Sequence, residues 1–120
     1  MHELSIAYNL VETAVAAAQK NNIQQVKAVH LRLGVLSGVE KEALLFGYDI
    51  ATENTLLAGS RLEIEELPVI VYCSQCRAEQ TLPDMQRFCC PQCGAATPQI
   101  VQGREIELHS MEVEDERAIA

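Results

Sequence analysis

Four of the five cysteines form two Cys-x-x-Cys pairs, and this spacing is typical of a metal site. The first pair is Cys73 and Cys76, and the second pair is Cys90 and Cys93. Each pair forms a tight turn that presents two thiolates, and two such turns complete a tetrahedron around Zn(II). Four thiolates would close the coordination sphere and leave no position for water or substrate. The spacing therefore predicts a structural zinc site rather than a catalytic one.

The fifth cysteine, Cys89, competes with its neighbour Cys90 for a place in this site. Choosing Cys89 would stretch the second pair to Cys-x-x-x-Cys and would lose the Cys-Pro-x-Cys-Gly pattern. We therefore assign Cys90 to the metal and expect Cys89 to be a free or packed thiol. A module this small buries little apolar surface and so lacks free energy of folding. Metal binding, which contributes on the order of 10–16 kcal/mol in zinc-finger peptides, would supply it.

Two other classes of protein use a four-cysteine site of this kind. In a rubredoxin-like electron carrier, iron fills the same four thiolates. A zinc-ribbon adaptor acting in transcription or translation would need a ribbon with a basic face lined by aromatic residues. Residues 69–103 instead carry no net charge and have only two aromatic residues, Tyr72 and Phe88, and the whole chain has a net charge of −8. Because an acidic surface repels phosphate, we expect no nucleic-acid partner. We find no catalytic constellation and no glycine-rich phosphate loop, so we predict that the protein is not an enzyme.

The chain begins Met1-His2-Glu3, a second group of candidate metal ligands. The terminal amine and the His2 amide nitrogen can close a five-membered chelate ring, and the same amide and the His2 imidazole can close a six-membered ring. Such nitrogen-rich, roughly planar sets suit Ni(II) or Cu(II). Glu3 could add its amide nitrogen or its carboxylate. The alternative is a solvated chain end, in which the Glu3 carboxylate interacts favourably with the dipole at the start of the helix. We expect His30 and His109 to be structural or surface residues.

The apolar spacing predicts five elements outside the cysteine module, over residues 3–20, 26–33, 37–52, 61–67 and 105–114. The first and third are helices and the others are strands. In the first helix the apolar side chains recur at spacings of three and four, and we expect these to face the core: Leu4, Tyr8, Val11, Val15 and Ala18.

The second helix has a start signal in the sequence. Ser37 is followed three residues later by Glu40, which is the spacing of a capping box. We therefore expect Ser37 to be the N-cap and the helix to run to about Thr52. Its inward residues should be Leu44, Leu45, Tyr48 and Ala51.

Composition divides the chain into two domains. Residues 69–103 contain all five cysteines and three of the four prolines, which indicates a metal-binding module inserted into an acidic α/β domain made of residues 1–68 and 104–120. The sequence contains no secretory signal and no apolar run of the roughly 20 residues that span a bilayer. We expect a cytoplasmic protein without a membrane partner, in which the thiols stay reduced and available to metal.

These features together resemble the HypA/HybF family. The resemblance rests on the start Met-His-Glu-Leu-Ser, the two Cys-x-x-Cys pairs and the closing Ser-Met-Glu-Val-Glu, and it covers nearly the whole chain. Members of that family are nickel metallochaperones for maturation of nickel–iron hydrogenase and, in some bacteria, of urease. The resemblance implies an α+β fold in which two helices pack on a three-stranded mixed sheet, with an inserted zinc-ribbon module.

The resemblance also implies sites and partners. Met1, His2 and Glu3 would bind nickel as transient cargo in the larger domain, and the two cysteine pairs of residues 69–103 would hold structural zinc. The implied partners are the GTPase HypB and the hydrogenase large subunit, and the protein would be a monomer or a homodimer. In some members an acidic residue at the position of Glu40 lies near the nickel. Because Glu40 also completes the predicted capping box, we give it low weight as a ligand, and whether Glu40 or a backbone amide completes the nickel site stays open.

Overall fold

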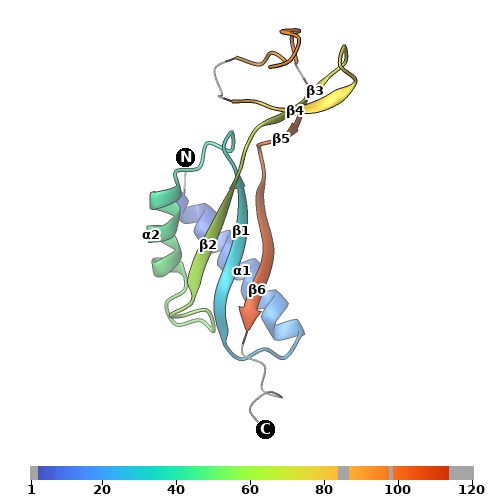
Figure 1. The fold of residues 1–120 in the computed structure, drawn as a ribbon. Helices are drawn as coiled ribbons and strands as arrows, with labels where there is room; N and C mark the ends of the chain where they lie inside the picture. Colours follow the sequence, from blue (N-terminus) through green and yellow to red (C-terminus); the bar gives the residue numbers. More distant parts are fainter. Residues whose placement is uncertain (1–2, 84–86, 98, 114–120) are drawn as a thin grey trace. The chain divides into compact units, whose positions relative to one another are not determined.

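The computed structural model describes residues 3–83, 87–97 and 99–113. Its elements follow the chain as α1 (Glu3–Lys20), β1 (Val26–Gly34), α2 (Lys41–Ala51), β2 (Arg61–Leu67), β3 (Ile70–Cys73), β4 (Ala78–Thr81), β5 (Ile100–Gln102) and β6 (Ile106–Val113) (Figure 1). The predicted helices and strands on both sides of the cysteine module are therefore present.

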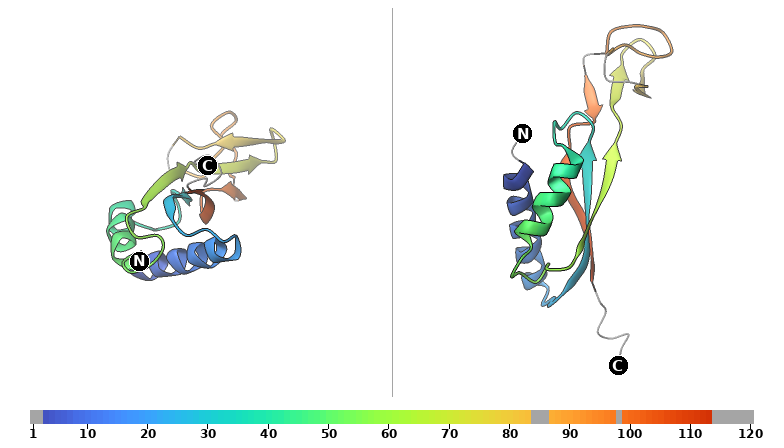
Figure 2. Two further views of the ribbon diagram at one scale, coloured as in Figure 1. Left: turned by 90° about the horizontal axis from the view of Figure 1, so that it is seen from below. Right: turned by 90° about the vertical axis from the view of Figure 1, so that its left-hand side faces the viewer.

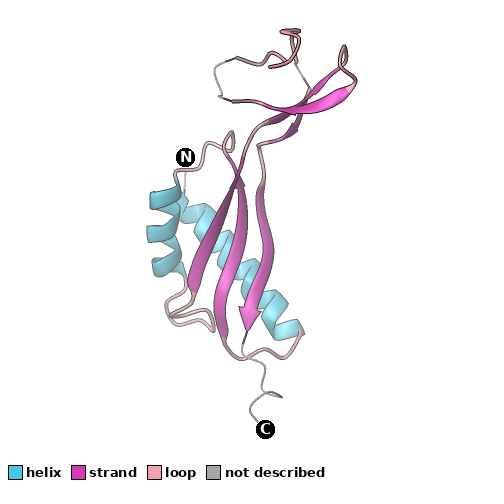
Figure 3. Cartoon of the chain, viewed as in Figure 1, coloured by secondary structure: helices cyan, strands magenta, loops and turns pink. Residues whose placement is uncertain are grey.

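The strands form two sheets of three strands each, ordered β2-β1-β6 and β4-β3-β5. In the first sheet β1 and β2 run in parallel while β6 runs the opposite way (Figure 2). Parallel neighbours need a crossover connection, and α2 provides it. In the second sheet β3 pairs antiparallel with both neighbours. Two helices with a mixed three-stranded sheet confirm the predicted α+β class (Figure 3).

The chain divides into two compact units. The first comprises residues 1–31, 39–64 and 108–120, and the second comprises residues 32–38 and 65–107. The second unit contains the sheet β4-β3-β5 and all five cysteines. The assignment of residues 1–68 with 104–120 to a nickel-binding domain, and of 69–103 to a zinc-binding domain, stays a prediction.

The inward face of α1 differs in part from the predicted one. Val11 and Ala18 are buried as expected, but Leu4 and Tyr8 are 46% and 49% exposed. Small residues take their place, and the buried set of α1 is Ala7, Leu10, Val11, Ala14 and Ala18. A Cβ added at Gly47 of α2 would lie 3.4 Å from the Ala7 Cβ. The two helices pack so closely that small side chains are favoured between them.

The capping-box prediction for α2 was wrong. The N-cap residue is Glu40, whose side chain accepts a hydrogen bond from the Glu42 N–H. The N–H of Ser37 instead donates to the Gly34 carbonyl oxygen at 3.0 Å, which closes a turn after β1. Leu36, beside Ser37, packs into the core of the second unit. This turn and its packing place Ser37 before the helix. The C-cap is Thr52, where the helix was expected to end.

The core of the second unit is small. Its buried apolar residues are Val69, Val71 and Leu82, and the partly buried side chains that pack on them are Leu36, Phe88 and Ile100. The backbone also approaches itself closely here, since a Cβ at Gly34 would lie 2.1 Å from the Gly103 carbonyl oxygen. A core of this size gives limited stability, so a cross-link in this unit would contribute a large part of the total.

Candidate metal centre

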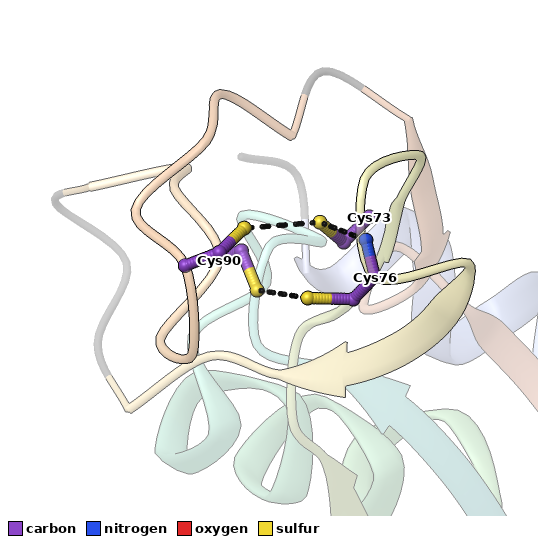
Figure 4. A group of neighbouring side chains, drawn as sticks. Cys73, Cys76 and Cys90 are labelled. Atoms are coloured by element: carbon purple, nitrogen blue, oxygen red, sulfur yellow. Dashed lines mark hydrogen bonds between the residues drawn. The ribbon is translucent and has the colours of Figure 1, made fainter.

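The four cysteines of the two pairs converge in the second unit. Their Sγ atoms all lie within 4.8 Å of one another, with Cys73 to Cys93 at 3.5 Å and Cys76 to Cys90 at 3.8 Å. Figure 4 shows the sulfurs of Cys73, Cys76 and Cys90 pointing toward one another. All four thiols are free, since a disulfide would bring two sulfurs to about 2.05 Å. With metal–sulfur bonds of about 2.3 Å, the edge of a tetrahedron is roughly 3.8 Å, so the spacing fits a single ion.

In both cysteine turns a backbone N–H donates to the sulfur of the first cysteine. In the first, between β3 and β4, the Cys76 N–H donates to Cys73 Sγ at 3.3 Å, and in the second the Gln92 N–H donates to Cys90 Sγ at 3.4 Å. The residue after each pair has a positive φ, which is 54° for Arg77 and 76° for Gly94. Gly94 adopts this conformation without strain, because glycine has no Cβ. Nothing in the sequence marked Arg77 for it.

A short antiparallel bridge holds the second turn. Cys89 pairs with Ala96, and the Cys90 N–H donates to the Ala95 carbonyl oxygen at 2.8 Å. Cys90 is 2% exposed and belongs to the four-sulfur group. Cys89 is half-buried and lies outside that group. The structure thus brings together the four sequence-predicted cysteines and leaves Cys89 apart from them.

The thiols of this group affect one another's pKa values. Burial raises the pKa of Cys90, but hydrogen bonds from the backbone N–H groups of Cys93 and Gln92 outweigh burial and lower the pKa to about 7. Hydrogen bonds with the other cysteines, first Cys93 and then Cys73, raise the pKa of Cys76 to about 12. One thiol therefore ionises readily and makes it harder to ionise its neighbours. A bound dication would remove this obstacle.

The second predicted site is described only at its last residue. Met1 and His2 lie outside the described residues, while Glu3 is the first residue of α1 and is half-buried. Its Oε2 accepts a hydrogen bond from the backbone N–H of Glu40 at 3.0 Å. No local sequence pattern predicts this contact, because it joins residues 37 positions apart.

The other two histidines occupy β1 and β6. His30 Nε2 lies 3.3 Å from the Glu112 carboxylate, which Arg61 also contacts at 3.3 Å, and His109 is exposed. Across the described ranges, the four cysteines are the one group of three or more histidine, cysteine or acidic side chains close enough to share a metal. In this part of the chain no helix is long and apolar enough to cross a membrane.

Fold and site together define a small α+β protein that carries a four-cysteine ribbon. Solved structures share this fold, and two of them are compared with this chain. The solution structure of the Ni metallochaperone HypA from Helicobacter pylori has a TM-score of 0.68 and 24% identity, and covers 94% of this chain and 97% of its own. A second solution structure of HypA protein has a TM-score of 0.71 at 24% identity, over 95% of this chain and 97% of its own.

Sequence comparison extends the likeness from fold to family. The family model described as hydrogenase/urease nickel incorporation, metallochaperone, hypA matches residues 1–113. The hydrogenase maturation factor HypA of Roseiflexus sp. (strain RS-1) is 58% identical over 116 residues, 97% of this chain and 94% of that protein. That of Methanocella arvoryzae is 41% identical over 95% of this chain and 99% of its own. The chain therefore belongs to the HypA family of nickel metallochaperones, which are accessory maturation factors.

Proposed function

We propose that this protein binds Ni(II) at its N-terminus and delivers it during maturation of nickel–iron hydrogenase, with urease as the alternative client. The observation that supports this most is the family match over residues 1–113, which includes both Met1-His2-Glu3 and the cysteine ribbon. In this proposal residues 1–68 and 104–120 form the nickel-binding domain and residues 69–103 the zinc-binding domain. The protein carries an ion and does not catalyse a reaction.

The chemistry of the chain start supports a nitrogen-donor nickel site. The Met1 amine, the His2 amide and the His2 imidazole form adjacent chelate rings around one ion. Because α1 begins at Glu3, the Glu3 amide precedes the first i→i−4 hydrogen bond of the helix. Coordination by this nitrogen leaves the hydrogen bonds between the turns of α1 intact. A nitrogen-rich donor set of this kind would suit Ni(II).

In the proposed function the ribbon has a structural role. Cys73, Cys76, Cys90 and Cys93 would hold Zn(II), which when bound cross-links the two cysteine turns of a unit with a small apolar core. The donor set fits, since four sulfurs lie at tetrahedral spacing and fill every position. Iron in the same four thiolates would instead make the purified protein coloured, with a visible absorption that is lost on reduction.

Transfer of nickel sets the expected affinity and partners. An ion that must be handed on is bound with modest affinity, and we propose the GTPase HypB and the hydrogenase large subunit as the cytoplasmic partners. The net charge of −8 attracts cations and a complementary partner surface. Electrostatic attraction of this kind raises association rates more than affinity.

Calorimetric titration of nickel into zinc-loaded His2→Ala tests the proposal. Loss of the imidazole and its chelate ring should abolish most of the wild-type affinity. His109→Ala is the matched control, because it removes an exposed imidazole elsewhere in the chain and should leave the titration unchanged. Wild-type affinity in His2→Ala would rule out the N-terminal site.

A further inference from the structure

We propose that the outer side of helices α1 and α2 is a docking surface for an amphipathic helix of a partner protein, whose apolar face is flanked by basic residues. The apolar part of this α1–α2 surface is formed by Leu4 and Tyr8 of α1 and by Phe46 of α2. All three belong to the first unit. The inference rests on the proposed function in one respect, which is that the ion passes to a partner protein.

Large apolar side chains are exposed on both helices. Phe46 is 70% exposed, the highest value among the large apolar side chains of the described residues, and Leu4 and Tyr8 are 46% and 49% exposed. Leu4 and Tyr8 follow the apolar periodicity of α1, yet smaller side chains fill the core in their place. Both helices cover the same face of the sheet β2-β1-β6 (Figure 2), so apolar side chains outside this core face solvent. Grouped apolar area with a polar rim marks an interaction site.

The three side chains lie close together because α1 and α2 touch beside them. A Cβ added at Gly47 would lie 3.4 Å from the Leu4 Cα and 3.5 Å from the Leu4 Cδ1, so Leu4 lies against α2 at the residue that follows Phe46. Tyr8 is about one turn further along α1, and residues four apart share a face of a helix. Leu4 and Tyr8 therefore form a row on α1 beside Phe46. A third helix can pack its own row of side chains into the groove between such rows.

Carboxylates end each apolar row and decide the charge of the partner. On α1, Glu12 follows Tyr8 by four residues, and on α2, Glu42 and Asp49 come four before and three after Phe46. These spacings place the carboxylates on the helix faces of Tyr8 and Phe46, and all three acidic residues are exposed. An apolar centre with acidic ends matches a helix whose apolar face is flanked by lysine or arginine, bound in the helix-in-groove mode.

A second copy of this chain matches the α1–α2 surface less well. In a two-fold dimer the same surface meets itself, so the carboxylates of Glu12, Glu42 and Asp49 from both copies would gather at one interface. The cations of the two helices, Lys20 and Lys41, are fewer than these acids. Like charges brought together at an interface disfavour association, so the occupant we assign is a basic partner.

A synthetic peptide tests the apolar part of the surface on the full zinc-loaded chain without nickel. The probe is a labelled helical peptide of leucine and lysine, with the leucines at helical spacing on one face, and fluorescence anisotropy measures its binding. Phe46→Ala should weaken binding roughly tenfold or more, the scale expected for an aromatic anchor. Val101→Ala should bind like wild type, and it is the matched control because Val101 is 43% exposed in the second unit.

The same titration tests the acidic ends of the surface. The double variant Glu42→Gln, Asp49→Asn should bind the peptide several-fold more weakly at low salt, and the difference should shrink as salt is added. The double variant Glu79→Gln, Glu107→Gln is the matched control, because it removes two exposed carboxylates from the second unit and should bind like wild type. A peptide with glutamate in place of lysine should not bind.

Three results would overturn the inference. The first is equal binding by wild type and Phe46→Ala, and the second is equal binding of the lysine and glutamate peptides. The third is a dimer in analytical ultracentrifugation that Phe46→Ala abolishes, which would make a second copy the occupant. Because no nickel is present, these results are distinct from wild-type nickel affinity in His2→Ala, which would rule out the N-terminal site.

Discussion

Replacing Cys90 with serine should release the metal from the second unit, whereas the same replacement at Cys89 should not. Cys90 is 2% exposed, and its Sγ lies 3.8 Å from Cys76 Sγ and accepts from the Gln92 N–H. Cys89 precedes it in the chain but lies outside the four-sulfur group. Serine has nearly the shape of cysteine, so the pair of variants isolates the sulfur at each position.

The size of the effect follows from what else holds this unit together. Three buried apolar side chains, those of Val69, Val71 and Leu82, contribute roughly 5–9 kcal/mol at about 1.5–3 kcal/mol each. A structural zinc site contributes about 10–16 kcal/mol in zinc-finger peptides. The metal is therefore the larger of the two contributions, and the apolar core alone should not keep the ribbon folded once a thiolate is lost.

Zinc content and amide hydrogen exchange, both measured under reducing conditions, give the test. The Leu82 N–H donates to the Val69 carbonyl oxygen at 2.9 Å, and the Tyr72 N–H donates to the Gln99 carbonyl oxygen at 3.0 Å. In Cys90→Ser these two amides should lose protection and zinc should fall below one equivalent, while the amides of α1 stay protected. Cys89→Ser should match wild type. Full zinc and full protection in Cys90→Ser would refute this reasoning.

Further predictions concern the backbone contact in the second unit, the buried tyrosine of α2 and the pH dependence of nickel binding. Gly34→Ala should lower the free energy of unfolding by about 1–3 kcal/mol or more in a denaturant titration, because its Cβ would lie 2.1 Å from the Gly103 carbonyl oxygen; wild-type stability would show that the backbone can separate there. Tyr48→Phe should cost about 1 kcal/mol, since it removes a buried 2.6 Å hydrogen bond to Ser60 Oγ. Burial raises the pKa of Tyr48, so the folded state keeps its proton longer than the unfolded state. Wild-type stability should therefore fall as pH rises above about 10, and the phenylalanine variant should lack this component. Nickel should leave as pH falls, because protons compete with the ion at the terminal amine and at the His2 imidazole; metal analysis after dialysis at stepwise lower pH should find nickel lost before zinc.

The cysteine ribbon and the elements around it were predictable because their signals are local. Two Cys-x-x-Cys pairs specify two turns whatever the rest of the chain does, and Gly94 has the positive φ that its turn requires. Arg77 also has a positive φ at the matching place in the other turn, although no glycine in the sequence predicts that conformation there. That turn connects the paired strands β3 and β4.

The errors arose where contacts between distant residues decide the outcome. Periodicity alone placed Leu4 and Tyr8 in the core, but close packing at Gly47 turned the alanine face of α1 inward instead. Ser37 has the right spacing for a capping box, yet the turn closed on Gly34 uses its N–H before the helix begins. The Glu3 contact that helps to cap α2 joins residues far apart in sequence. None of these contacts leaves a short-range signal.

The central claim is that the terminal amine of Met1 is part of the nickel site, and acetylation of that amine tests it most directly. Acetylation removes one donor nitrogen and leaves every side chain, including His2 and the cysteine ribbon, in place. Calorimetric titration of nickel into zinc-loaded acetylated protein should show a large loss of affinity relative to the unmodified chain. Unchanged affinity and stoichiometry after acetylation would contradict the account.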